Sequence, residues 1–389
     1  MIVYKKLQFF LKSISCLVLT LLVMGLWSCD KKNELAKSLR SSEVQSAGPR
    51  TIVDHTGVEV VLPAEIKRIV IAGLLPMTSV YCLYTGSSQG LVGIPASSKV
   101  AAENSLLIEA YPTLADLPTD FESNGVVNVE RLLELKPDVV FYGSSNVQTR
   151  QALDNAGIPA VGFSTTQAGY NTVETYAGWI ELLGQVFAGD RRIDTSRAAE
   201  IVQYGRDVES LVKERLADVA QEDKPRVMIA YYYDDAGGLR TSGSNFFGQY
   251  WIEVAGGVNV AEALSGSPNV NMEQVYQWNP DVIFITNFSP RLPEDFYNNT
   301  ITADDWSSVQ AVKSGQVYKF PLGMYRWFPP SSDTPLAVLW MAKTLHPQLF
   351  ADIDLDHVVR DYFQRFYGVS LTEEEMYKIY HPAREASGK

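Results

Sequence analysis

One pattern of residues occurs twice in the sequence, and this repeat constrains the fold more than any other feature. Residues 128–141 read NVERLLELKPDVVF, and residues 271–284 read NMEQVYQWNPDVIF. In each copy an Asn, a favourable N-cap residue, precedes a short amphipathic run, and a Pro-Asp pair separates that run from a β-branched and aromatic segment. Each copy therefore predicts a surface helix that ends near the proline and leads into a buried strand. A chain of 389 residues exceeds one ordinary core, so the repeat predicts two similar lobes.

The segments around the two copies extend this prediction. Short β-branched runs alternate with helical patterns on both sides, as in the strand expected at residues 68–72 and the helix that begins at Pro76. Strand signals are absent between residues 170 and 220, where two helices are expected and the second is long. We predict an α/β fold of two similar lobes with mostly parallel sheets, bridged by one long rigid α-helix. The expected lobes are residues 51–190 and 223–389, with the bridging helix in residues 191–222.

The N-terminal residues have the pattern of an export signal. Lys5, Lys6 and Lys12 precede the apolar run CLVLTLLVMGLW, which is shorter than the roughly 20 residues that a membrane-spanning helix needs. The run ends in LWSC, which resembles the lipobox of bacterial lipoproteins, where the chain is cut before a cysteine that becomes lipidated. We expect a signal peptide in residues 1–28, a lipid on Cys29 and a polar tether in residues 29–50. The alternative is that Cys29 is an unmodified thiol.

Charge and cysteine content exclude two classes of protein. The formal net charge is −12 at pH 7, and the expected signal peptide contains lysines but no acids, so its removal makes the chain more negative. Nucleic acid is therefore not expected as a partner. After removal of the signal peptide, which contains Cys16, and lipidation of Cys29, Cys82 is the only thiol left. No disulfide framework is therefore expected, and Cys82 is interpreted as a small buried apolar residue.

The ordered motifs resemble those of the substrate-binding proteins that serve ABC importers for iron-siderophores, haem and cobalamin. The resemblance covers nearly the whole chain after the signal peptide, from TIVDHTGVEVVLPAEIKRIV through both repeats to WSSVQAVKSGQVYKFP. It implies a monomer, lipid-anchored at the extracytoplasmic face of the cell membrane, that holds a metal chelate between its lobes. It also implies delivery of that ligand to an ABC permease with its cytoplasmic ATPase, with no cofactor and no catalytic residues.

The resemblance assigns a role to one acid in each repeat. In relatives, a Glu near the start of the corresponding helix in each lobe pairs with arginines of the permease, and here those positions are Glu130 and Glu273. The alternative is that each Glu only stabilises the N-terminus of its helix by about 0.3–1 kcal/mol. Both copies carry the acid at the same position, which favours docking. The Pro-Asp pairs are interpreted as structural.

The ligand is expected at the carboxyl ends of the strands, where open α/β sheets bind ligands. The loops expected there in the second lobe are rich in aromatic rings and arginines, which suit a large, anionic or aromatic ligand. The candidate ligand-binding residues are Tyr231, Tyr232, Tyr233, Arg240, Met324, Tyr325, Arg326 and Trp327. Because strand residues alternate between faces, Tyr231 or Tyr233 is expected to be lost to the core. A ferric siderophore is the expected ligand, and haem, cobalamin and another metal chelate stay open.

Two other kinds of site were weighed. A site for bare zinc or manganese draws on histidines and carboxylates together, yet the histidines at positions 55, 346, 357 and 381 lie outside the expected loops. No metal ligand is therefore assigned, although coordination of iron by a tyrosine stays open. The run GSSQG, residues 86–90, matches the nucleophile elbow of serine hydrolases with Ser88 as nucleophile. That motif needs a strand before it and a helix after it, and the pattern here predicts the reverse order.

Overall fold

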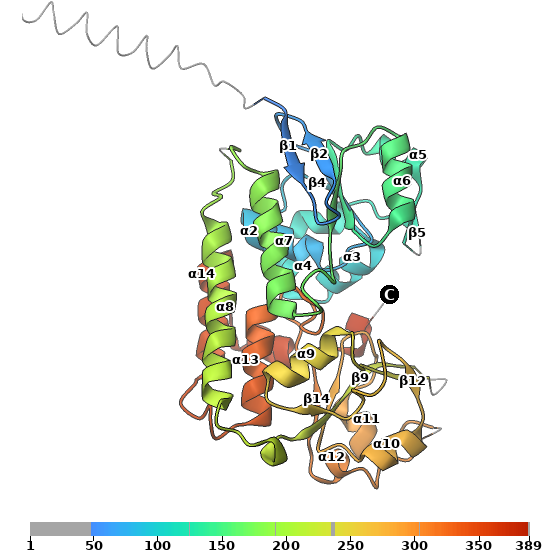
Figure 1. Ribbon diagram of the computed structural model, residues 1–389, viewed down its shortest axis with the longest axis vertical. Coiled ribbons are helices and arrows are strands. Elements are labelled where there is room, and N and C mark those ends of the chain that lie inside the picture. The colour runs from blue at the N-terminus through green and yellow to red at the C-terminus, as the bar shows by residue number, and fades with distance from the viewer. Residues whose placement is uncertain (1–47, 124, 191, 235–237, 303, 388–389) are drawn as a thin grey trace, which may run out of the picture. The chain divides into compact units, whose positions relative to one another are not determined.

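The computed structural model describes residues 48–387 except for residues 124, 191, 235–237 and 303 (Figure 1). The expected signal peptide, Cys29 and the expected tether up to residue 47 lie outside the described residues. From Pro49 onward the chain forms one compact unit. Within the described ranges, no helix combines the length and the hydropathy required to cross a membrane.

The first lobe is built on a parallel sheet of four strands in the order β4-β3-β7-β8. An antiparallel hairpin precedes this sheet, and a second small hairpin lies beside it. The strands are β1 (Arg50–Val53), β2 (Glu59–Leu62), β3 (Ile69–Ala72), β4 (Leu91–Gly93), β5 (Glu122–Ser123), β6 (Val126–Val127), β7 (Val139–Gly143) and β8 (Ala160–Phe163). The helices are α2 (Met77–Thr85), α3 (Ala96–Glu103), α4 (Leu106–Ala110), α5 (Val129–Glu134), α6 (Val147–Asn155) and α7 (Thr172–Val186), with a 3-10 turn at Pro112–Asp116.

The second lobe contains a mixed sheet of six strands. Its path is β12-β10-β9-β13-β14, and β11 also pairs with β9; the pairs β9–β13, β13–β14 and β9–β11 are parallel. The strands are β9 (Arg226–Tyr233), β10 (Leu239–Thr241), β11 (Val258–Asn259), β12 (Asn269–Val270), β13 (Val282–Ile285) and β14 (Val317–Lys319). The helices are α9 (Phe247–Val254), α10 (Met272–Trp278), α11 (Pro293–Tyr297), α12 (Gln310–Lys313), α13 (Thr334–Leu345), α14 (Leu355–Tyr367) and α15 (Glu373–Tyr380), with 3-10 turns at Gln221–Asp223 and Arg384–Ser387.

The two copies of the repeat form the same unit in both lobes. The Asn128 side chain accepts a hydrogen bond from the Arg131 N–H at 3.2 Å at the start of α5, and Asn271 accepts one from Gln274 at 3.0 Å at the start of α10. Each helix leads through the Pro-Asp pair into a central strand, β7 or β13. The carboxylates of both Pro-Asp pairs accept backbone N–H groups at the start of the neighbouring strand: Asp138 from Lys67 and Arg68, and Asp281 from Arg226. The Pro-Asp pairs are therefore structural, as predicted.

A single long helix, α8 (Arg197–Leu216), joins the lobes. It packs against α7 and α2 of the first lobe and against α13 and α9 of the second (Figure 1). The Arg197 guanidinium donates to the carbonyls of Leu83 in α2 and Phe366 in α14, at 3.0 and 2.7 Å. The largest buried cluster of apolar side chains also includes residues from both sheets. The predicted fold class is confirmed, and the shared core ties the lobes into one rigid unit.

Candidate functional site

The loops that follow β9, β13 and β14 meet at one edge of the second sheet, as the strand-end rule predicts. The Ser289 hydroxyl donates to the Tyr233 carbonyl at 3.1 Å, and the Asn287 amide donates to the Phe320 carbonyl at 2.7 Å. The Lys319 ammonium lies beneath these loops and donates to the carbonyls of Thr286, Ser289 and Arg291 at 2.9, 2.5 and 2.9 Å. These bonds hold the three loops in fixed positions.

Cationic groups gather at this edge. Each of three guanidinium groups lies over an aromatic ring: Arg326 over Phe288 at 4.8 Å, Arg291 over Tyr233 at 5.4 Å and Arg240 over Tyr231 at 5.5 Å, measured from Cζ to the ring centroid. Burial, together with the charges of Arg326 and Arg384, lowers the pKa of Lys319 to about 7. A strongly acidic chain thus concentrates positive charge at one sheet edge, which favours an anion there.

A β-bulge in β9 sorts the three consecutive tyrosines. Thr241 of β10 pairs with Ala230 while Arg240 pairs with Tyr232, so Tyr231 is an extra residue on β9. The Tyr231 ring packs among Phe246, Phe288 and Phe328, whereas Tyr233 turns into the core on the other face. The Tyr233 hydroxyl donates to the Asp304 carboxylate and accepts from Trp306 Nε1 at 3.2 Å. Tyr233 is therefore a core residue, in keeping with the expectation that one of Tyr231 and Tyr233 points into the core.

The loop from Gly323 to Trp327 is organised around one buried carboxylate. Asp333 Oδ2 accepts the N–H groups of Met324 and Tyr325 at 2.7 and 3.1 Å and the Trp327 indole N–H at 3.1 Å. A Cβ atom at Gly323 would lie 2.4 Å from the same oxygen, so only glycine fits there. Burial raises the pKa of Asp333 to about 6, and the hydrogen bonds it accepts oppose that rise.

This geometry places two of the predicted ligand contacts inside the core. Trp327 is fully buried, and its only polar atom is bonded to Asp333. Met324 is also fully buried within the core. The buried Asp333 carboxylate satisfies the indole N–H of Trp327 and so allows the complete burial of this side chain.

The same loop also touches the first lobe. The Leu106 N–H at the start of α4 donates to the Gly323 carbonyl at 3.1 Å, and the Ser105 hydroxyl donates to the Met324 carbonyl at 3.3 Å. A second contact joins the rings of Tyr170, just before α7, and Phe247, at the start of α9, with centroids 5.5 Å apart. The Gly323–Trp327 loop therefore lies where the lobes meet.

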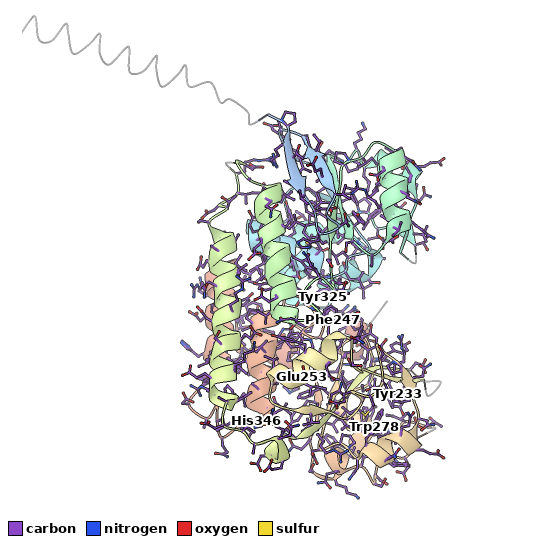
Figure 2. The ribbon with its side chains drawn as sticks, viewed as in Figure 1. Tyr233, Phe247, Glu253, Trp278, Tyr325 and His346 are labelled. Atoms are coloured by element: carbon purple, nitrogen blue, oxygen red, sulfur yellow. The ribbon has the colours of Figure 1, made fainter. Side chains whose placement is uncertain are left out.

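Tyr325 is the most unusual side chain at this junction. Figure 2 labels it close to the level of Phe247, where the two lobes meet. The residue is 1% exposed, and its hydroxyl has no hydrogen-bond partner among the described residues. Burial raises its pKa, while the neighbouring Arg326 guanidinium opposes that rise. A buried hydroxyl without a partner costs about 1–3 kcal/mol, so it is available to a ligand that enters the junction.

The other predicted ligand residues lie around Tyr325. Arg326 is buried and donates from Nη2 to the Ala386 carbonyl at 3.0 Å, Tyr231 and Tyr232 are half-buried, and Arg240 is exposed. Arg240 donates to the Ser267 carbonyl at 3.0 Å. Besides Tyr325, four of the eight predicted residues therefore remain candidates for contact with a ligand, namely Tyr231, Tyr232, Arg240 and Arg326.

Glu130 and Glu273 occupy matching places in the two lobes. Each is exposed and is the second residue of its helix, directly after an Asn cap and one apolar residue. No hydrogen bond or ion pair joins either carboxylate to another described residue. Both acids are thus free to bind a partner, and docking stays a prediction.

The GSSQG run at residues 86–90 does not have the strand before it and the helix after it that a nucleophile elbow needs. Ser88 lies between helix α2 and strand β4, the reverse of the strand–turn–helix order of a nucleophile elbow, and its hydroxyl hydrogen-bonds the Thr113 hydroxyl at 2.8 Å. Across the described ranges, no three histidine, cysteine or acidic side chains are grouped so as to hold a metal ion.

Sequence reasoning missed three contributors to this junction. They are the Asp333 carboxylate, the Ser105–Leu106 contact and the C-terminal turn that bonds Arg326. Asp333 sits in the run SSD before an apolar helix, a common N-cap pattern, and nothing in that pattern points back to residues 323–327. The other two contacts join segments far apart in the chain, for which one sequence carries no signal.

Comparison with known proteins gives a consistent result. A family model described as periplasmic binding protein matches residues 80–322. The molybdate-binding protein MolA of Haemophilus influenzae is 29% identical over 357 residues, covering 86% of this chain and 96% of MolA. The iron-uptake system-binding protein of Bacillus subtilis is 25% identical over 320 residues, covering 78% of this chain and 88% of that protein.

Solved structures share the whole fold. A periplasmic solute binding protein from Veillonella parvula is 32% identical with a TM-score of 0.76, covering 86% of this chain and 97% of its own. The structure of MolA bound to molybdate is 28% identical with a TM-score of 0.69, covering 83% of this chain and 99% of its own.

Proposed function

Because the chain belongs to the periplasmic binding protein family, we propose that it is the extracytoplasmic receptor of an ABC importer and captures an anionic ligand between its lobes. The observation that carries the anionic class is the set of three guanidinium groups at the strand ends of the second lobe. Arginine presents planar donor pairs that match oxyanions and carboxylates. The fold supports a transport role. The order of helix, Ser88 and strand, which is the reverse of a nucleophile elbow, argues against hydrolysis.

A small tetrahedral oxyanion of the molybdate class is the first candidate ligand. MolA, which resembles this chain along nearly its full length, binds molybdate. The buried hydroxyl of Tyr325 suits such an ion, because a compact anion needs a few fixed donors in a closed site. The carbonyls of Gly323 and Met324 bond the first lobe, and this direct contact between the lobes favours a small ligand as well.

An anionic iron complex, above all a ferric siderophore, is the second candidate. The observation that favours it is the aromatic cluster of Tyr231, Phe246 and Phe288, because flat rings bind catecholate and porphyrin ligands. A protein that serves iron uptake in Bacillus subtilis also resembles this chain. Haem and cobalamin remain further alternatives on the same grounds.

We also propose that a lipid on Cys29 holds the receptor at the extracytoplasmic surface. The support is the lipobox-like LWSC run after a basic and apolar segment. Glu130 and Glu273 would then dock the lobes onto the two halves of the permease.

Calorimetric titration of the purified chain distinguishes the ligand classes. Molybdate, a ferric tris-catecholate siderophore, haemin and cobalamin are titrated separately at equal protein concentration. We expect saturable binding of molybdate with a dissociation constant of about 1 μM or below, which corresponds to a binding free energy of about −8 kcal/mol or stronger. Tight binding of the siderophore alone would replace the first candidate by the second. Binding of cobalamin alone would contradict the anionic class.

Replacement of Tyr325 by Phe tests the junction as the site. Tyr325→Phe removes only the hydroxyl, so we expect the affinity for the bound anion to fall about tenfold while thermal stability is unchanged or slightly higher. The matched control is Tyr84→Phe, which removes another buried hydroxyl without a described partner, in helix α2. That variant should keep full affinity. Equal affinity of the Tyr325 variant and the unaltered chain would move the site away from this hydroxyl.

A further inference from the structure

The last described turn of the chain is firmly attached to the second lobe. Arg384 donates from Nη1 and Nη2 to the two carboxylate oxygens of Asp295 at 2.6 and 2.7 Å, and Nη1 also donates to the Pro290 carbonyl at 3.1 Å. Burial raises the pKa of Asp295, but the hydrogen bonds from Arg384 and from the Leu292 N–H outweigh it, so the net pKa is lowered. This carboxylate stays charged near neutral pH. A bidentate, partly buried ion pair is therefore a durable anchor.

Beyond Arg384 the turn lies against both lobes. Ala386 is only 2% exposed, and its carbonyl accepts the hydrogen bond from Arg326 Nη2 at 3.0 Å. The turn Arg384–Ser387 also contacts helix α3 of the first lobe, and Figure 1 shows the red end of the ribbon between α3 and the second lobe. The buried turn therefore lies at the junction of the two lobes, directly beside the Arg326 guanidinium.

We propose that residues 382–387, named here the C-terminal wall, close one side of the cleft and set the largest ligand that the receptor accepts. The inference rests on the proposed function, because it takes the junction beside Arg326 and Tyr325 as the ligand site. On this proposal a compact oxyanion binds with the wall in place, whereas a bulky metal chelate requires the turn to be displaced. The wall therefore selects by size, and the arginines select by charge.

The rest of the junction cannot widen to replace this selection. The Gly323 and Met324 carbonyls are bonded to Leu106 and Ser105 of the first lobe, and helix α8 packs on both lobes. Moving the lobes apart would break these bonds and open the shared core. Displacing the wall breaks the ion pair of Arg384 with Asp295 and the bond from Arg326 to the Ala386 carbonyl, but leaves the bonds of Gly323 and Met324 to the first lobe in place.

Three variants of the full chain test the wall. The first ends at Ala383, the second is Arg384→Gln, which loses the bidentate pair but keeps every residue, and the control is Arg360→Gln. Arg360 makes a comparable ion pair with Glu373, at 2.8 Å on the surface between α14 and α15. Each variant is titrated with molybdate and with a ferric tris-catecholate siderophore. Accessibility of Arg326 is measured independently of any ligand by phenylglyoxal labelling and mass spectrometry.

If the C-terminal wall limits ligand size, its removal should change the preference between molybdate and the siderophore, and the control variant should keep the original preference. In the truncated chain and in Arg384→Gln, we expect the affinity for the siderophore to rise about tenfold or more, the affinity for molybdate to fall, and labelling of Arg326 to increase severalfold. The Arg360 variant should behave as the unaltered chain. Unchanged labelling and unchanged preference in a variant with an intact thermal transition would overturn the inference. Increased labelling of Arg326 without binding of either probe to any chain would support the wall and count against the proposed ligand.

Discussion

A chain carrying both Glu130→Arg and Glu273→Arg is expected to bind its ligand normally and to support no uptake through its permease. The two acids are exposed, lie at the same helical position in the two lobes and have no described partner. If each faces arginines of the permease, reversal places like charges in contact at two points, and each such contact costs several kcal/mol. We expect uptake by cells to fall about 100-fold or more, with the calorimetric affinity for the ligand unchanged.

The matched control changes the same amount of charge elsewhere on the surface. Glu222→Arg with Asp223→Arg alters two exposed acids of the turn that precedes β9, so that net charge and long-range attraction change equally. This control should transport at the normal rate, and each single reversal should have an intermediate effect. Normal uptake by the double variant would leave only the helix-dipole role for the two acids. Lost ligand affinity would instead place the binding site near the repeat helices.

The fold could be predicted because its signals are local. An Asn cap, an amphipathic run and a Pro-Asp pair each act within a few residues, so both copies of the repeat gave the correct helix, strand and order of elements. The long bridging helix was expected because strand signals are absent between residues 170 and 220, and it was found at Arg197–Leu216. Which helices cover that bridge could not be predicted, because α13 and α14, which contact it, lie far from it in the sequence.

The site could be predicted only as a set of loops. The rule that strand ends share one edge brought residues 231–234, 286–291 and 320–327 together correctly. The rule does not predict side-chain directions. The bulge at Tyr231 reverses the face on which Tyr233 lies, and the hydrogen bond to the buried Asp333 places Trp327 in the core. The wall at Ala386 was also invisible, since its bond to Arg326 joins residues 60 positions apart with no local pattern.

Asp333→Ala is expected to cause the largest loss of stability of any single substitution in this region. The carboxylate is fully buried, and its removal leaves the N–H groups of Met324, Tyr325 and Trp327 without their acceptor and opens a cavity beside Gly323. Each buried N–H group left without an acceptor lowers the stability by about 1–3 kcal/mol. Removal of the buried charge of Asp333 offsets part of this loss. We expect a fall of about 2–5 kcal/mol in the free energy of unfolding, measured in urea, together with loss of ligand binding because Tyr325 loses its support.

The pH dependence separates this role of Asp333 from a simple loss of volume. Because the pKa of Asp333 is raised from the ordinary 3.8 to about 6 in the folded state, the folded state binds the proton more tightly than the unfolded state does. The stability that this protonation contributes is lost as pH rises through about 6. When the pH falls from about 7 to about 5, the free energy of unfolding of the unaltered chain should therefore rise by about 1 kcal/mol relative to that of Asp333→Asn, which cannot titrate at this position. Asp354→Ala, which removes an exposed N-cap carboxylate from α14, should cost only about 0.5–2 kcal/mol. A constant difference between the unaltered chain and Asp333→Asn across this range would mean that the buried carboxylate stays ionised, held by its three N–H donors alone.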